Sequence, residues 1–228
     1  MSITTSWIDI TPGFAGYLAL PPAGHGPGLV LFQEIFGVNE HIRAVAEQYA
    51  LDGFVVLAPD VFWRQAPRVE LGYKGEDRQR AIALMQAQQP ADLLADIHAA
   101  AATLRARPET AGRKLGAIGY CMGGRLAYVA AAKAGVDAAV PFYGGGIHNT
   151  LDIAGDITCP VQFHYAENDS NIPLEAVERV RTALPQAEVL VYPGSTHGFN
   201  CWARASYHAP SAALSHGRSL QFLAQALF

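Results

Sequence analysis

The sequence has few charged residues and no run of Lys or Arg. Charged residues make up 16% of the chain, and the formal net charge is −4. Proteins that bind nucleic acid or an anionic membrane surface normally carry a clustered basic patch. We therefore expect no nucleic-acid partner and no membrane partner. The apolar stretches are all broken by Gly, Pro or a charge well before the roughly 20 residues of a membrane span.

Cysteine is also scarce, with three in 228 residues. Three cysteines do not make a disulfide framework, and their spacing fits no zinc site. No H-E-x-x-H or comparable spacing is present, so we predict no metal and no cofactor. The first residues lack the basic and apolar regions of a secretory signal. We therefore expect a cytoplasmic protein, in which a reactive thiol would stay reduced.

Half of the residues are apolar, and short β-rich runs alternate with longer helical patterns. This alternation is typical of βαβ units, so we predict an α/β fold with a mostly parallel sheet flanked by helices on both faces. One domain over residues 1–228 is expected, as a monomer, with a dimer left open. Strands are predicted at 7–10 and 14–20, as an antiparallel edge hairpin, and at 28–32, 54–58, 114–118, 137–142, 160–165 and 187–191. Helices are predicted at about 39–51, 76–88, 91–106, 122–134, 173–184 and from 211, with an irregular loop over 59–75.

The most specific motif is Gly119-Tyr120-Cys121-Met122-Gly123-Gly124, between a predicted strand and a predicted helix. G-x-C-x-G is a nucleophile elbow with cysteine in place of serine. Glycines on both sides permit the tight turn that projects the sulfur above the sheet. The main alternatives are a buried structural cysteine and a dinucleotide-binding turn. The glycine spacing fits the second poorly, so we predict Cys121 as the nucleophile.

A histidine base and an orienting acid are expected to follow the nucleophile in the order acid, then histidine. Asp169 follows the strand predicted at 160–165, and His197 follows the strand predicted at 187–191. Both would lie at the carboxyl edge of the sheet, where open α/β sheets gather their sites. Glu167 is the alternative to Asp169 as the acid. Cys121, Asp169 and His197 are therefore the predicted site.

Four motifs in this order resemble those of the dienelactone hydrolase family, also called carboxymethylenebutenolidase-like. They are Gln33-Glu34-Ile35-Phe36-Gly37-Val38-Asn39, Gly119-Tyr120-Cys121-Met122-Gly123-Gly124, Asp169-x-x-Ile172-Pro173 and His197-Gly198-Phe199. The resemblance implies the α/β-hydrolase fold and a triad of Cys121, His197 and Asp169. It also implies that Glu34 pairs with the thiol and receives its proton, and that the backbone N–H groups of Ile35 and Met122 hold the oxyanion.

The resemblance further implies a small lactone or ester substrate, cleaved through a thioester. It assigns Arg80 to a substrate carboxylate, although a solvated helix charge is an equal interpretation. Tyr143 is either a pocket residue or a core aromatic. Leu84 and Cys201 stand where dienelactone-cleaving members carry a tyrosine and a second arginine, and Arg204 lies out of register.

Three functions therefore stay open. The first is a dienelactone hydrolase of aromatic-compound degradation, and the second is a related carboxylesterase or lactonase with a different, less acidic substrate. The third is a non-catalytic binding protein on a hydrolase scaffold.

Overall fold

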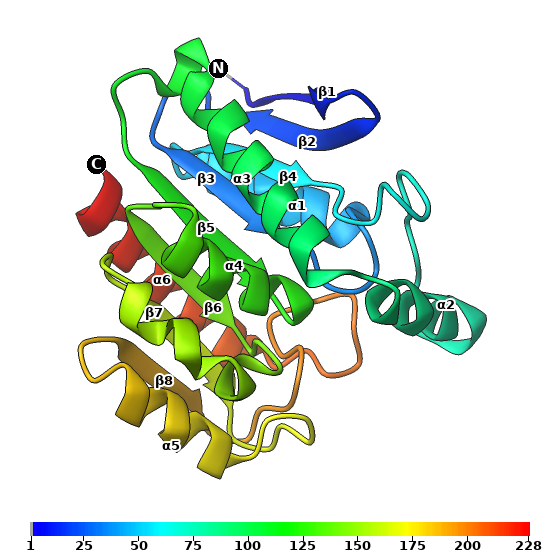
Figure 1. The fold of residues 1–228 in the computed structure, drawn as a ribbon, viewed down its shortest axis with the longest axis vertical. Helices are drawn as coiled ribbons and strands as arrows, with labels where there is room; N and C mark the ends of the chain where they lie inside the picture. Colours follow the sequence, from blue (N-terminus) through cyan, green and yellow to red (C-terminus); the bar gives the residue numbers. More distant parts are fainter. Residues whose placement is uncertain (1) are drawn as a thin grey trace.

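The computed structural model describes residues 2–228, so Met1, the first residue of the predicted domain, lies outside the described residues. An eight-stranded sheet with the order β1-β2-β4-β3-β5-β6-β7-β8 runs through the molecule (Figure 1). β1 and β2 pair antiparallel at one edge, β2 is antiparallel to β4, and the remaining neighbours are parallel. The predicted mostly parallel sheet is confirmed. The strands are β1 (Thr4–Thr11), β2 (Phe14–Leu20), β3 (Gly28–Phe32), β4 (Val55–Pro59), β5 (Leu115–Tyr120), β6 (Ala138–Phe142), β7 (Gln162–Ala166) and β8 (Glu188–Tyr192).

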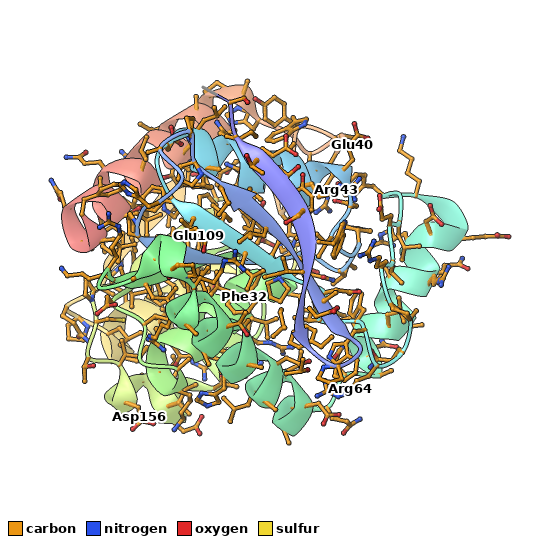
Figure 2. All side chains as sticks on the ribbon, turned by 90° about the horizontal axis from the view of Figure 1, so that it is seen from above. Phe32, Glu40, Arg43, Arg64, Glu109 and Asp156 are labelled. Carbon is orange, nitrogen blue, oxygen red and sulfur yellow. The ribbon has the colours of Figure 1, made fainter. Side chains whose placement is uncertain are left out.

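Helices cover both faces of this sheet. In Figure 1, α3, α4 and α5 lie in front of the strands, and α1 and α6 lie behind them. α2 stands apart from both layers, and Figure 2 shows it at the rim of the molecule, seen from above. No helix formed by residues 2–228 combines the length and apolar character needed to cross a membrane. The helices are α1 (Glu40–Leu51), α2 (Gly75–Gln86), α3 (Pro90–Ala106), α4 (Met122–Lys133), α5 (Leu174–Ala183) and α6 (Ala209–Leu227), with short 3₁₀ turns η1 (Pro108–Thr110), η2 (Ile147–Asn149) and η3 (Leu151–Asp156).

Local chemistry accounts for most element boundaries. The Asn39 side chain accepts a hydrogen bond from the N–H of Ile42 and caps α1. Pro90 begins α3, where a missing N–H costs nothing. α6 begins at Ala209, two residues earlier than predicted, because its first turn accommodates Pro210. β5 runs two residues further than predicted, so that it delivers Cys121 directly at its end.

The predicted irregular loop lies between β4 and α2. The Asp60 carboxylate accepts hydrogen bonds from the N–H groups of Phe62 and Arg68 and thereby fixes the start of this loop. Further along, Glu70 forms an ion pair with Arg43 of α1, 2.7 Å between Oε1 and Nη1. Arg43 is labelled in Figure 2, on the side of α1 that faces the loop before α2. The loop is therefore held against α1 beside the carboxyl edge of the sheet.

α4 packs unusually close to β3. A Cβ at Gly123 would collide with the carbonyl oxygens of Phe32 and Gln33. Only a residue without a side chain allows the N-terminus of α4 to reach the carboxyl end of β3. This contact brings the loop after β3 and the residue before α4 to the same edge of the sheet.

We predict that Gly123→Ala destabilises the fold by about 1–3 kcal/mol, because the added methyl group must displace backbone rather than a flexible side chain. Gly217→Ala is the matched control in α6, where a Cβ meets nothing within 4 Å. It should stabilise the fold by about 0.5–1 kcal/mol through helix propensity. Urea unfolding of the two variants measures both effects. Equal and small changes would contradict the close approach of α4.

Candidate active site

Cys121 occupies the turn between β5 and α4 in a strained conformation. Its φ is 57° and its ψ is −116°, which a residue with a Cβ rarely adopts. Its N–H donates to the carbonyl of Phe142, and its carbonyl accepts from the N–H of Gly124, each at 3.0 Å. Such strain persists only where surrounding structure enforces it, and it gathers at functional sites. The half-buried thiol thus lies where the elbow motif predicts it.

Two further glycines make room for this turn. A Cβ at Gly119 would overlap the carbonyl of Gly123, and a Cβ at Gly124 would overlap the carbonyl of Phe142. In the first turn of α4 the N–H of Gly124 donates to the carbonyl of Cys121, whereas the N–H at the helix start lacks a partner within the helix. Within residues 2–228, the N–H groups of Met122 and Ile35 donate to no protein group. Both therefore remain available for the oxyanion role that the sequence predicts.

His197 and Asp169 are brought together from the loops after β8 and β7. His197 Nδ1 lies 2.7 Å from Asp169 Oδ2, and the Asp169 side chain is fully buried. The other carboxylate oxygen, Oδ1, accepts from the N–H of Asn171 and fixes the orientation of the acid. Glu167, the alternative acid, is exposed and instead accepts from the N–H of Gly194. The geometry therefore favours Asp169 over Glu167 as the partner of His197.

The environment of His197 favours its charged form. Burial opposes the charge, but hydrogen bonds to Asp169 and Cys121 and the charges of both groups outweigh burial and raise the pKa of His197 to about 10. The imidazole ring also meets the edge of the Tyr143 ring, with centroids 5.1 Å apart. At neutral pH the ring therefore carries two protons, one of which is held on Nδ1 by Asp169.

Glu34 is buried just after β3, but its partner differs from the one the sequence implied. Glu34 Oε1 accepts a hydrogen bond of 2.9 Å from Arg204 Nη1, whereas no hydrogen bond joins Glu34 to Cys121 among residues 2–228. Glu34 Oε2 has no partner. The ion pair leaves one carboxylate oxygen free, because Arg204 neutralises the charge from the other side.

Arg204 is held in place by its neighbours. Its guanidinium lies over the rings of Phe36 and Tyr73, 5.6 and 5.9 Å from their centroids. It also packs against Gly198, where φ is +81° and an added Cβ would overlap the guanidinium. The sequence assigned Arg204 no role, because dienelactone-cleaving family members carry their second arginine at the position of Cys201, three residues earlier. No local motif identifies it, since its contacts come from three separate loops.

The two predicted substrate-binding residues differ in their surroundings. Tyr143 is fully buried, has a φ of 34°, and its hydroxyl has no hydrogen-bond partner. Burial, followed by the charges of Glu34 and Cys201, raises its pKa well above the ordinary value, so the phenol is neutral and close to the site. Arg80 is an exposed residue of α2, without a hydrogen bond or ion pair among residues 2–228.

The two positions that depart from the family pattern also differ from one another. Leu84 is half-buried on α2. Cys201 is fully buried, and its thiol donates to the hydroxyl of Tyr73, 3.5 Å from sulfur to oxygen. Cys201 thus occupies the interior beside Arg204 rather than offering a charge to a substrate.

The sheet order, the helices on both faces and the Cys–Asp–His order at the carboxyl edge define an α/β-hydrolase fold. The model of the dienelactone hydrolase family matches residues 14–227. The chain therefore belongs to the dienelactone hydrolase family and is a hydrolase of carboxylic esters or lactones.

Individual relatives agree with this assignment. Carboxymethylenebutenolidase of Pseudomonas putida is 34% identical over 215 residues, covering 92% of this chain and 91% of the relative. A Synechocystis protein provisionally given the same name is 37% identical over 212 residues, which cover 87% of this chain and 86% of the relative. A crystal structure of a provisionally named dienelactone hydrolase from Klebsiella pneumoniae has a TM-score of 0.85 at 32% identity. The match covers 99% of this chain and 100% of that chain. The alternative of a non-catalytic binding protein gains no support from these relatives.

We predict that the charged state of His197 contributes to stability in a defined pH window. Its pKa rises from 6.5 to about 10 on folding. A raised pKa stabilises the fold fully below pH 6.5, and this contribution is lost as the pH rises through about 10. Asp169→Asn should flatten the fall in unfolding free energy between pH 6.5 and pH 10, as measured by urea unfolding.

Glu167→Gln is the control for this measurement, because Glu167 is exposed and does not contact His197. It should keep the wild-type slope. If Asp169→Asn showed that same slope, the Asp169–His197 pair would not set the pKa of His197.

Proposed function

We propose that this hydrolase cleaves its substrate through Cys121 and a thioester acyl-enzyme. The observation that carries the proposal is the strained elbow of Cys121 beside the Asp169–His197 pair. A nucleophile, a base within reach and a group that orients the base are the minimal set for covalent acyl transfer. The free N–H groups of Ile35 and Met122 would supply the oxyanion site, and each such donor typically contributes roughly 3–4 kcal/mol to the transition state.

The first proton transfer is assigned to Glu34 rather than to His197. The negative charge of Cys121 is one of the causes that raise the pKa of His197 to about 10, so a protonated ring beside a Cys121 thiolate is the state that follows the first proton transfer. Glu34 Oε2 is unpartnered and buried, so it is available to take the proton of the Cys121 thiol. This proton transfer would accompany substrate binding, as the resemblance to the family implies.

The remaining steps return Cys121, Glu34 and His197 to their starting protonation states. The Cys121 thiolate adds to the carbonyl carbon, and the C–O bond of the lactone or ester breaks as His197 gives its proton to the leaving oxygen. Neutral His197 next takes a proton from water, which attacks the thioester. Release of the acid frees the Cys121 thiolate, which recovers its proton from Glu34. Throughout, Asp169 holds the ring by its Nδ1 proton.

We predict that Cys121→Ala lowers hydrolysis by at least about a thousandfold, because no other nucleophile replaces the sulfur. The panel would contain dienelactone, simple lactones and aryl esters. Cys159→Ala is the matched control, since that half-buried thiol lies before β7, away from the elbow. Mass spectrometry of the wild type, quenched during turnover, should show an acyl group on Cys121. An active Cys121→Ala variant would disprove the mechanism.

The substrate is proposed to carry a carboxylate. The resemblance assigns this anion to Arg80, whose exposed guanidinium has no protein partner in residues 2–228. Arg204 is not free for this role, because it is already paired with Glu34. The alternative is a neutral ester or lactone, which Leu84 and the uncharged Cys201 favour.

We predict that Arg80→Gln lowers kcat/KM for carboxylate-bearing lactones about tenfold or more, because a hydrogen bond between charged groups is lost. Hydrolysis of a neutral aryl ester should stay unchanged. Arg78→Gln, an equally exposed arginine on the same helix, is the control and should alter neither activity. Equal kinetics of Arg80→Gln and wild type on both substrates would favour the neutral-substrate alternative.

A further inference from the structure

Three metal-ligating side chains meet beside the candidate active site. Glu34 comes from the loop after β3, His41 from the first turn of α1, and Cys201 from the loop between β8 and α6. One carboxylate oxygen, one ring nitrogen and the sulfur all lie within 4.8 Å of one another. The three residues are 1%, 3% and 0% exposed, respectively. We call them the Glu34–His41–Cys201 cluster.

The protein itself leaves this cluster unsatisfied. Glu34 Oε2 and both ring nitrogens of His41 are buried without a hydrogen-bond partner. Each buried polar atom left unpaired costs about 1–3 kcal/mol, and most such atoms in native proteins have a protein, water or ion partner. An unpaired ring nitrogen of His41 lies within 4.8 Å of the Cys201 sulfur and of a Glu34 oxygen, which indicates a ligand that accepts electron pairs.

The setting of His41 suits a metal ligand. Its buried ring packs edge-to-face on Trp202, with centroids 4.1 Å apart, and this contact restricts the orientation of the ring. A neutral imidazole held in one orientation is the form that coordinates a cation.

The donor types select among cations. Ca²⁺ and Mg²⁺ prefer oxygen ligands alone, whereas a thiolate with an imidazole and a carboxylate suits Zn²⁺ and similar thiophilic ions. Tetrahedral Zn²⁺ places its ligand atoms roughly 3.3–3.8 Å apart. The cluster, now within 4.8 Å, would close by about 1 Å, which side-chain rotation can supply. Three protein ligands leave a fourth position for water.

The charges at the cluster favour a cation. Glu34 and a Cys201 thiolate supply two negative charges and Arg204 supplies one positive charge, so the empty cluster would carry one net negative charge. His41 lines a cleft of about 480 Å³ together with Tyr73 and Trp202, so this member of the cluster lies next to a cleft. Burial raises the pKa of Cys201 to about 12, so a metal ion would have to displace the thiol proton.

We propose that Glu34, His41 and Cys201 form an inhibitory site for a thiophilic divalent cation, with Zn²⁺ as the ion that fits best. On binding, the Cys201 thiol releases its proton to solvent, and the thiolate, the neutral imidazole and the Glu34 carboxylate each donate an electron pair. The metal would then be coordinated by Glu34, and the carboxylate could no longer receive the Cys121 proton. This inhibition rests on the proposed function, whereas the binding site does not.

Binding is tested with Zn²⁺ in competition with a chromophoric chelator, and with Co²⁺ through its thiolate charge-transfer absorption. Cys121→Ala should bind one equivalent like the wild type, which separates the cluster from the Cys121–His197 pair. His41→Phe, which keeps a ring against Trp202, and Cys201→Ser should each weaken binding at least tenfold. Thermal melts verify that both variants are folded. Loss of binding in Cys121→Ala, or wild-type affinity in both other variants, would overturn the site.

Inhibition is tested separately by activity. Zn²⁺ should inhibit the wild type, and a chelator should restore the full rate. His41→Phe should show wild-type activity in chelator and lose its sensitivity to Zn²⁺ at least tenfold. One equivalent of Zn²⁺ bound by Cys121→Ala without inhibition of the wild type would retain the site and disprove the role given to Glu34.

Discussion

The site depends on the close approach of α4 to the carboxyl ends of its neighbouring strands. Gly119, Gly123 and Gly124 each face a backbone carbonyl at a distance that excludes a side chain. Cys121, directly before α4, has a positive φ, and the N-terminus of α4 lies against the carbonyls of Phe32 and Gln33. If the helix retreated by the width of a methyl group, the Cys121 turn would move away from the loop after β3. Backbone packing, rather than any side-chain contact, therefore sets the geometry of the chemistry.

Much of this arrangement follows from local sequence. Buried strands such as β3 and β6 read as uninterrupted apolar runs because parallel strands are covered on both faces. The strand–turn–helix around Cys121 was predictable, since its glycines serve a steric need that acts over few residues. The order of Asp169 and His197 followed from topology, because parallel strands deliver their loops to one edge. The choice of Asp169 over Glu167 agrees with the hydrogen bond to His197.

The electrostatic surroundings of the site were beyond sequence reasoning. Glu34 and Arg204 are 170 positions apart, and their contact depends on the path of a loop without periodic pattern. His41 and Cys201 were assigned no chemistry for the same reason: metal-site spacing is recognisable in sequence only when the ligands share a short segment. The guanidinium that donates to Glu34 Oε1 was not indicated by the sequence. Arg80 illustrates the converse: the resemblance assigns it a role, while its exposed position on α2 defines no contact.

The contact between Arg204 and Gly198 links two positions that appear unrelated in the sequence. The guanidinium fills the volume that a Cβ at position 198 would need, and that same guanidinium neutralises Glu34. A side chain at 198 would push Arg204 away and leave a buried carboxylate uncompensated. Gly198 is thus constrained twice, by its φ of +81° and by the guanidinium beside it, and loss of Arg204 would remove only the second constraint. Through this contact, the loop that carries His197 also sets where the counter-charge of Glu34 lies.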